Sequence, residues 1–249
     1  IGTSGRYEFK NKGIDVFLES LNRLNRDKDL KKKVLAFVNV PSWVGDPRED
    51  LQKRLKSKDK FTEPLQCPFI THWLHNMTHD QVLDMLKYLG MGNRPEDKVK
   101  VIFVPCYQDG HDGILNKHYY DLILGEDLSV YPSYYEPWGY TPLESVAFRV
   151  PTITTDLAGF GLWVNSLKNQ HGINDGVEVL HRSDYNYSEV ADGIKDTVAL
   201  FSTKTEAEIK EIRKRAGQVA EQALWKHFIQ YYYEAYDIAL RNAMKRQLK

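Results

Sequence analysis

Residues 13–41, GIDVFLESLNRLNRDKDLKKKVLAFVNVP, decide the fold. The first half repeats apolar residues at helical spacing, so residues 13–25 are predicted to form a helix with one buried face. The second half holds the continuous apolar run Val34–Val38, which Pro41 closes. A short apolar run without alternation is typical of a strand buried on both faces. A helix followed by such a strand indicates a helix-covered parallel sheet.

The same alternation continues along the rest of the chain. Further strands are expected at residues 1–4, 99–104, 128–131, 152–154 and 177–180, and further helices at 81–89, 119–124, 142–148, 188–201, 206–224 and 225–246. Strands separated by helices connect by right-handed crossovers and give a doubly wound sheet. The predicted fold class is therefore α/β, with a doubly wound, Rossmann-like parallel sheet.

Two regions fall outside this alternation. Residues 41–79 hold tryptophan- or proline-marked loops around a charged segment, and we expect them to form an insertion on the sheet. The tyrosine-rich helix at 225–246 is expected to pack on a neighbouring unit. Because the chain starts without methionine, in what reads as a strand already under way, we expect it to be cut from a longer protein.

Composition excludes several classes of protein. Lysine plus arginine equals aspartate plus glutamate, at 34 each, whereas nucleic-acid binders usually carry a basic excess. The longest run without a charged residue, 64–79, has 16 residues and is too short and too polar for a membrane helix. Two cysteines cannot build a disulfide framework, which favours a cytoplasmic location.

The functional residues are expected beyond the carboxyl ends of the strands, where ligands of open parallel sheets bind. Arg6 and Lys12 follow the first strand, and the segment 134–144, YYEPWGYTPLE, follows the fourth. Thr141 and Glu144 fit a capping box, which predicts a helix that starts at residue 141. The free amides at 139–143 then favour phosphate, and Gly139 allows close approach.

The two glutamates of this segment admit two interpretations. Glu144 can simply close the capping box, and Glu136 can be an ordinary loop carboxylate. Two features favour a site instead. The tyrosines and tryptophan beside them are costly to expose unless they wall a pocket. Arg6 and Lys12 supply the countercharge that a diphosphate requires.

Residues 131–142, YPSYYEPWGYTP, resemble glycogen synthases of the animal and fungal type, and Glu136 and Glu144 match the Glu-x7-Glu signature of retaining glycosyltransferases with the two-domain B-type fold. Residues 3–13, 97–103 and 225–243 also resemble that family, and the likeness covers most of 1–40 and 95–249. It implies that residues 1–249 are the C-terminal, nucleotide-sugar-binding domain of such an enzyme. The N-terminal acceptor domain of the family is absent, and the C-terminal helix at 225–246 is expected to pack against it.

The resemblance implies transfer of glucose from a nucleoside diphosphate, UDP rather than ADP, to the non-reducing end of an α-1,4-glucan, with retention and no metal or other cofactor. By position, the implied catalytic residues are Arg6, Lys12 and Glu136. The implied donor-binding residues are Tyr119, Trp138, Gly139, Tyr140, Thr141 and Glu144. Tyr119 resembles a ring that stacks on the base, and a core-facing tyrosine is its alternative. The isolated domain is expected to bind nucleotide and to transfer little sugar. The sequence does not decide whether the protein forms an oligomer.

Weaker signals point elsewhere. His72, His75 and His79 have spacings that a metal site could use, but ordinary histidines are the favoured interpretation. Gly159 and Gly161 form a Gly-x-Gly for which a plain turn is favoured over a phosphate loop. The basic residues at 210 and 213–215 are interpreted as a solvated helix face rather than a glucose 6-phosphate sensor.

Two other functions are weighed against glucosyl transfer from a nucleotide sugar to a glucan. One is a non-catalytic glycan-binding or scaffold module, which would bind oligosaccharides without nucleotide. The retained cations and glutamates speak against it. The other is a related transferase with a different sugar or acceptor.

Overall fold

The computed structural model describes residues 1–168, 170 and 172–247. Six parallel strands form the central sheet in the order β5-β2-β1-β6-β7-β8. They are β1 (Gly2–Ser4), β2 (Val34–Asn39), β5 (Val99–Val104), β6 (Ser129–Val130), β7 (Thr152–Thr155) and β8 (Val177–Leu180). All six predicted strands are confirmed, and their order reverses direction between β1 and β6, as in doubly wound nucleotide-binding sheets.

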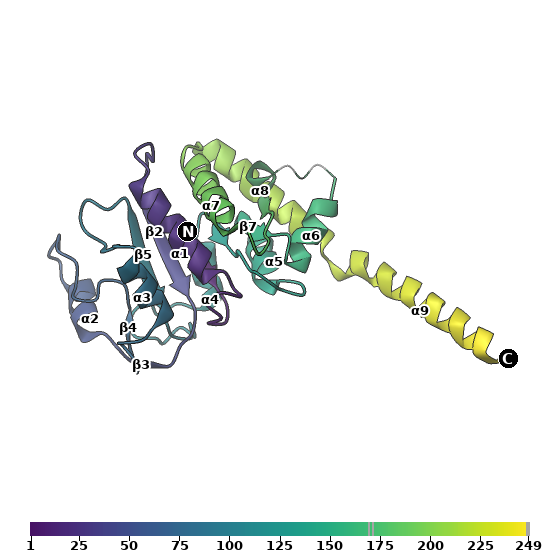
Figure 1. Cartoon of the computed structure of the whole chain (residues 1–249), viewed down its shortest axis with the longest axis horizontal. Helices are drawn as coiled ribbons and strands as arrows, with labels where there is room; N and C mark the ends of the chain where they lie inside the picture. The colour runs from purple at the N-terminus through teal and green to yellow at the C-terminus, as the bar shows by residue number, and fades with distance from the viewer. Residues whose placement is uncertain (169, 171, 248–249) are drawn as a thin grey trace.

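Helices cover both faces of this sheet (Figure 1). They are α1 (Ile14–Arg26), α3 (Gln81–Tyr88), α4 (Tyr119–Leu124), α5 (Tyr140–Ala147), α6 (Gly159–Ser166), α7 (Tyr187–Ser202), α8 (Glu206–Gln222) and α9 (Trp225–Gln247). Strand β6 shows the two layers directly. Val130 belongs to the core under α1, whereas the Ser129 hydroxyl accepts a hydrogen bond from Ser145 of α5 at 2.7 Å.

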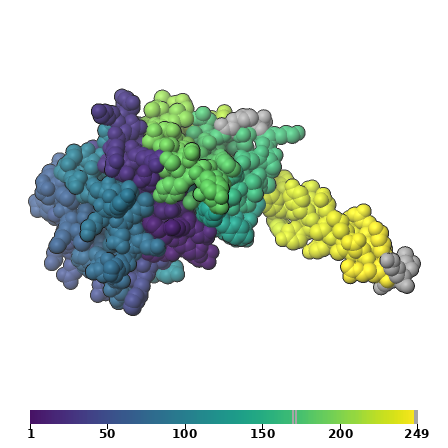
Figure 2. All heavy atoms as spheres, viewed as in Figure 1, coloured from purple at the N-terminus to yellow at the C-terminus, as the bar shows by residue number. Residues whose placement is uncertain are grey.

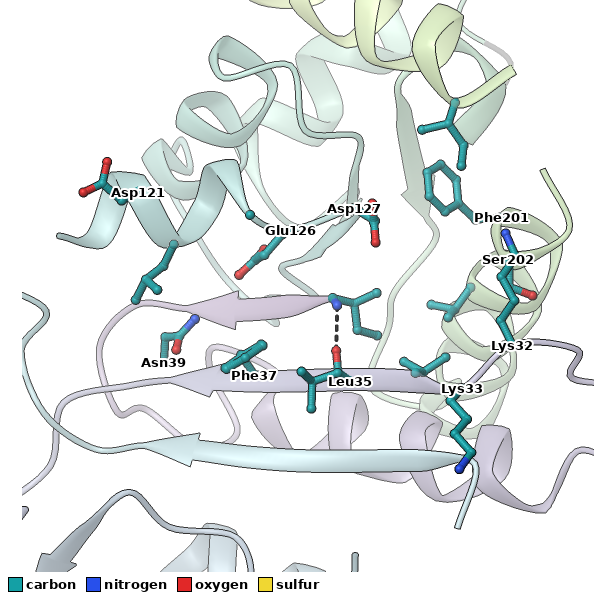
Figure 3. Close-up of a pocket in the computed structure, with 16 residues that line it drawn as sticks. Lys32, Lys33, Leu35, Phe37, Asn39, Asp121, Glu126, Asp127, Phe201 and Ser202 are labelled. Carbon is teal, nitrogen blue, oxygen red and sulfur yellow. Dashed lines mark hydrogen bonds between the residues drawn. The ribbon is translucent and has the colours of Figure 1, made fainter. Parts of the chain in front are cut away.

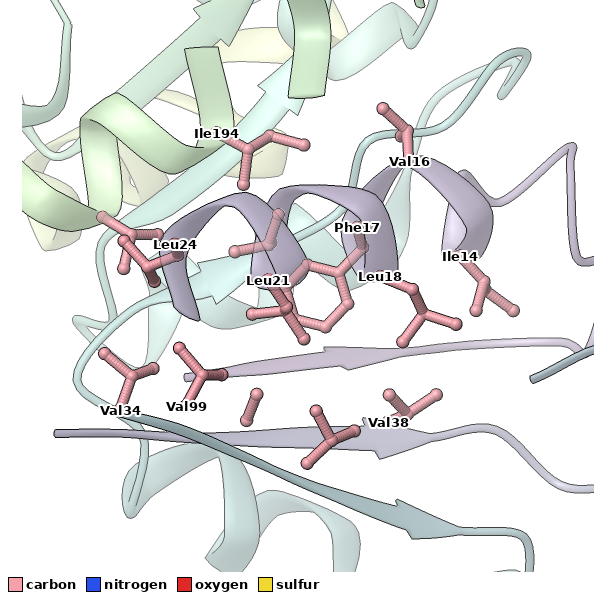
Figure 4. Packing of buried hydrophobic residues seen from close by; sticks show 14 of the residues in the cluster. Ile14, Val16, Phe17, Leu18, Leu21, Leu24, Val34, Val38, Val99 and Ile194 are labelled. Atoms are coloured by element: carbon pink, nitrogen blue, oxygen red, sulfur yellow. The ribbon is translucent and has the colours of Figure 1, made fainter. Parts of the chain in front are cut away.

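The main core lies between α1 and the strands β2 and β5 (Figure 4). The apolar face that the sequence predicts, with Phe17 and Leu21 at its centre, points onto the sheet, and Ile194 of α7 closes it from above. Phe17 is fully buried. Burying one such side chain stabilises a fold by about 1.5–3 kcal/mol, so this face fixes α1 on the sheet.

Residues 41–79 form more structure than the expected loops. They contain β3 (Val44–Pro47), α2 (Glu49–Lys56) and β4 (His72–Leu74), and β3 pairs with β4 in a separate antiparallel sheet. Strands of three or four residues carry too few positions for a readable alternation, which is why the sequence pattern missed them.

Helix α9 extends away from the rest of the molecule (Figures 1 and 2). Most of its side chains are exposed, including eight large apolar ones: Trp225, Tyr231, Tyr232, Tyr233, Tyr236, Ile238, Leu240 and Met244. The predicted helix is confirmed. Within the described residues, no helix combines the length and the apolar character that crossing a bilayer requires.

Candidate donor-binding site

The predicted site residues follow two strands that are neighbours in the sheet. Arg6 and Lys12 come after β1, and Glu136 comes after β6. The two connecting segments touch, because the Tyr134 amide donates a hydrogen bond to the Asn11 carbonyl at 2.7 Å. The order of the strands reverses here, and open α/β sheets bind ligands in the crevice above such a point.

A cavity of about 580 Å³ lies at this edge of the sheet. It collects residues from distant parts of the chain, and four of the predicted site residues line it: Arg6, Tyr119, Thr141 and Glu144. A second cavity of about 500 Å³ opens near the amino ends of the strands, beside Lys33, Leu35 and Glu126 (Figure 3). Only the first cavity has the start of α5 in its wall, and that helix end attracts anions.

Lys12 and Glu136 form an ion pair at the same edge of the sheet, although neither residue is in the lining of the first cavity. Their side chains are only 15% and 20% exposed, so water screens the pair weakly. Gly13 allows the segment that carries Lys12 to lie close to the segment that carries Glu136. Its φ is +68°, and a Cβ atom there would lie 2.0 Å from the Pro132 carbonyl oxygen. The pair places a cation and a carboxylate next to each other at the switch point of the sheet.

The backbone around Glu136 is fixed by a neighbouring segment. The Glu136 amide donates to the Leu157 carbonyl at 3.2 Å, and the Gly159 amide donates to the Glu136 carbonyl at 3.0 Å. Gly159 and Gly161 open helix α6, so the expected plain turn is wrong. Cβ atoms there would lie 2.2 Å from the Pro137 and 2.1 Å from the Thr155 carbonyl oxygens. Gly159 allows α6 to pack closely on the loop that carries Glu136, and Gly161 allows it to pack closely on the end of β7.

Helix α5 begins one residue before the predicted position. It starts at Tyr140, Gly139 is its N-cap with φ +107°, and no side chain caps it. The predicted capping box between Thr141 and Glu144 is therefore wrong, because both residues lie inside the helix and line the cavity instead. The first amides of α5 are left for another acceptor.

Glu144 is partly removed from water by its neighbours. The Tyr120 hydroxyl donates to its Oε1 at 3.3 Å, and burial raises the pKa of the Glu144 carboxyl above its ordinary value. A half-buried carboxylate with spare acceptor capacity fits a ligand hydroxyl.

Tyr119 lines the same cavity in a half-buried position. Its hydroxyl shares a hydrogen bond with the Ser4 hydroxyl at 2.8 Å, and burial raises its pKa to about 12. The hydroxyl is anchored at the end of β1 and the residue borders the cavity, and its stacking on a base stays a prediction.

Arg6 is the most exposed of the predicted catalytic residues, and its guanidinium pairs with Glu8 at 2.9 Å. Its loop is anchored by Tyr7, which sequence reasoning missed. The Tyr7 hydroxyl donates to Asp80 at 2.7 Å and accepts from the Val82 amide at 3.0 Å. Asp80 is the N-cap of α3. A polar residue just before a predicted helix was the available signal.

Trp138 and Tyr140 lie apart from the cavity lining. Trp138 belongs to an aromatic cluster between α6 and α9. The centroid of its ring lies 6.1 Å from that of Phe160, 5.8 Å from that of Trp163 and 5.5 Å from that of Phe228. The Tyr140 side chain is exposed. Their part in donor binding stays a prediction.

Asn39 and Gln108 line the cavity without having been predicted. The Gln108 side-chain amide donates to the Asn39 side-chain Oδ1 at 2.9 Å. Asn39 ends the apolar strand β2, so the change from apolar to polar at a strand end was the signal in the sequence.

Comparisons with known proteins show the family to which the chain belongs. The family model described as glycogen synthase matches residues 1–46 and 46–249. The chain is 28% identical over 297 residues to glycogen [starch] synthase of Neurospora crassa, covering 97% of this chain and 42% of that protein. It is 32% identical over 232 residues to the Caenorhabditis elegans protein, covering 72% and 34%. The chain spans about two fifths of the length of the curated relatives it matches.

Among solved structures, the fold is similar to a crystal structure of the pneumococcal O-GlcNAc transferase GtfA. The TM-score is 0.51 at 13% identity, with 96% of this chain and 35% of that chain covered. This likeness concerns the fold alone. The family match spans nearly every residue, and the YPSYYEPWGYTP segment follows β6 beside the switch point. The chain therefore belongs to the glycogen synthase family.

Proposed function

We propose that this chain is the donor-binding half of a retaining glucosyltransferase of the glycogen synthase type. The complete protein would move glucose from a nucleoside diphosphate, UDP by preference, to the non-reducing end of an α-1,4-glucan. The observation that carries the proposal is the Lys12–Glu136 pair at the same edge of the sheet as a cavity lined by Arg6, Tyr119 and Glu144. The choice of UDP rests on likeness to the animal and fungal enzymes.

The charges of the pair match the charges that develop during transfer. When the bond between glucose and diphosphate breaks, negative charge grows on the leaving oxygen and positive charge grows at the anomeric carbon. Lys12 and Arg6 offset the first charge, and the Glu136 carboxylate offsets the second. Because the ion pair holds the Lys12 and Glu136 side chains in place, these side chains need to move little when the ligand binds.

The start of α5 supplies the second anchor for the diphosphate. Its uncapped amides, next to Gly139, are oriented donors at the positive end of a helix dipole. With these amides and two cations, we propose that transfer itself needs no metal or other cofactor. We also propose that Glu144 accepts from the ribose and that Tyr119 contacts the base.

The exposed apolar residues of α9 offer a contact surface for the other half of the protein. We propose that this helix packs against the N-terminal, acceptor-binding half, which would hold the glucan. Both cysteines are free thiols, which supports our proposal of a cytoplasmic location.

Nucleotide binding is the direct test of the proposal. Calorimetric titration of the chain with UDP, ADP and their glucose conjugates should show millimolar or tighter affinity, with UDP above ADP. Lys12→Ala should weaken UDP binding at least tenfold, whereas Lys10→Ala, on an exposed position of the same loop, should change it less than twofold. Absence of binding by all four compounds at millimolar concentration rules the proposal out.

Transfer itself is tested in the complete protein. Glu136→Gln should lower the rate of glucose incorporation into glycogen at least a hundredfold and change UDP affinity less than threefold. Turnover close to that of the unmodified enzyme contradicts the role of Glu136. Binding of maltohexaose by the chain without any nucleotide binding would favour a glycan-binding module instead.

A further inference from the structure

Three potential metal ligands from separate segments meet at the wall of the cavity that Arg6 and Glu144 line, which we call the donor cavity. His72 belongs to β4, Cys106 follows β5, and Asp112 lies in the loop that leads to α4. One ligand atom from each lies within 4.8 Å of the other two. His72 is 3% exposed and Cys106 is 8% exposed, so the surrounding packing restricts the positions of these two side chains.

The His72 ring is held by both of its nitrogens. Nδ1 lies 2.9 Å from the Thr71 hydroxyl oxygen, and Nε2 lies 2.7 Å from the Asp112 backbone oxygen. A backbone carbonyl oxygen only accepts, so the ring proton is on Nε2, which donates to Asp112, and Nδ1 carries the lone pair. The Thr71 hydroxyl donates to Nδ1 and can donate to the Phe103 carbonyl at 3.4 Å instead, which frees Nδ1 for a metal. A ring N–H that donates to a neighbour is the usual orientation of a metal-binding histidine.

The Asp112 carboxylate is also fixed in advance. Its Oδ1 accepts from the amides of Ile114 and Leu115 at 2.9 and 2.8 Å, and its Oδ2 accepts from the Asn116 amide at 2.7 Å. These bonds hold the carboxylate in one orientation. Across the part of the chain that the structure describes, no lysine or arginine pairs with Asp112, so its negative charge is balanced by amides alone.

We propose that His72, Cys106 and Asp112 form a binding site for Zn²⁺. An imidazole nitrogen, a thiolate and a carboxylate are the ligand types that zinc takes, and bond lengths of about 2.0–2.3 Å place tetrahedral ligands within about 4 Å of one another. Closing from 4.8 Å requires small side-chain shifts. The Cys106 thiol loses its proton to solvent on binding, the imidazole keeps its single proton on Nε2 and offers Nδ1 to the metal, and water takes the fourth position.

The site is distinct from the transfer chemistry and does not rest on the proposed function. It ties β4 to the loop after β5, and Cys106 and Gln108 of that loop region face the donor cavity. Zinc would therefore clamp the insertion of residues 41–79 onto the wall of the cavity. Because the ligands come from positions 72, 106 and 112, no local spacing in the sequence reveals them.

Cobalt is the probe for this site, since Co²⁺ replaces Zn²⁺ and is coloured. The chain is treated with EDTA, desalted and titrated with CoCl₂. We expect one equivalent of cobalt, tetrahedral bands in the visible and a thiolate-to-cobalt band in the near ultraviolet. ZnCl₂ should then bleach these bands at one equivalent.

The second cysteine and a second histidine provide matched controls. Cys106→Ala should abolish the thiolate band and weaken binding at least tenfold, whereas Cys67→Ala, at an exposed free thiol, should change neither. His72→Asn should behave like Cys106→Ala, and His75→Asn, at an exposed histidine, like the unmodified chain. Asp112→Asn keeps the side-chain volume and is the variant to test if circular dichroism shows that the other variants are unfolded. A thiolate band that persists in Cys106→Ala, or cobalt binding unchanged in Asp112→Asn, overturns the proposal.

Discussion

Two segments of this chain carry the same pattern, Thr-x-x-Glu, and use it differently. At 205–208 the pattern forms a capping box, in which Thr205 accepts from the Glu208 amide and Glu208 accepts from the Thr205 amide. At 141–144 it caps nothing, because α5 has already started at Tyr140. The first glutamate stabilises its own helix. The second accepts from the Tyr120 hydroxyl and lines the cavity at the carboxyl ends of the strands.

The cause of the difference lies in which residue is the N-cap of each helix. Thr205 is itself the N-cap of α8, in ordinary extended backbone with φ −75° and ψ 161°. The N-cap of α5 is Gly139, two residues before Thr141, with φ +107°, a conformation that side chains disfavour. With the glycine as the N-cap, Thr141 and Glu144 fall inside α5 and line the cavity.

Glu126 is a third glutamate to compare with Glu208 and Glu144, and it is almost fully buried. Ser129 donates to it at 2.7 Å, and burial raises its pKa from 4.5 to about 7. The folded protein therefore holds a proton that the unfolded chain releases, and the free energy of unfolding should fall as pH rises from about 4.5 through 7. At about 1.4 kcal/mol per pH unit, the loss is on the order of 3 kcal/mol.

Urea unfolding of the chain at pH 5 and pH 8 measures this loss, and Glu126→Gln should remove most of it. Glu208→Gln is the control at an exposed carboxylate and should leave the pH dependence in this range as it is. Equal stability of the unmodified chain at both pH values would show that Glu126 is ionised throughout.

Gly139→Ala attacks the proposed cause directly. A side chain at φ +107° costs on the order of 1–3 kcal/mol, and the added Cβ would lie 3.1 Å from Pro142 Cγ. We expect loss of stability together with at least tenfold weaker UDP binding, measured by urea unfolding and calorimetry.

Gly217→Ala is the matched control within α8. That glycine has no positive φ, and its new Cβ would meet only the flexible Arg149 side chain at 3.1 Å. We expect a stability change below about 1 kcal/mol and unchanged UDP affinity. If Gly139→Ala behaves in the same way, the early start of α5 does not depend on glycine.

Alanine at the two threonines should separate the two uses of the motif. Thr205→Ala removes a helix cap and should cost about 1 kcal/mol, with no effect on UDP binding. Thr141→Ala should leave stability within about 0.5 kcal/mol and should weaken UDP binding severalfold. The reverse assignment of effects would mean that Thr141 does cap α5 in solution.

The smallest expected effect is a difference in pKa between the two glutamates. Hydrogen bonds from the backbone and side chain of Thr205 lower the pKa of Glu208, whereas burial raises that of Glu144. Stability linked to Glu208 is present above its unfolded pKa and is lost as pH falls through the folded one, and Glu144 has the opposite sign. Carbon-detected NMR titration of the two carboxyl groups should place them on opposite sides of the ordinary value.

Most of the sheet and its helices could be predicted from the sequence because each depends on a repeating local pattern. The apolar face around Phe17 and the run Val34–Val38 each fit one secondary structure only, and both are confirmed. The boundaries at Gly139 and Gly159 were missed because a glycine fits a turn, a cap or a close contact equally well. Neighbouring backbone decides among these.

The sequence by itself determined which side chains follow which strand, and so it brought Arg6, Lys12 and Glu136 to one edge of the sheet. The tertiary structure alone decided that Lys12 pairs with Glu136, that Glu144 faces a cavity, and that His72 meets Cys106. The physical reason is range. Local pattern fixes backbone geometry over a few residues, whereas contacts across 34 or 124 positions depend on how the layers pack.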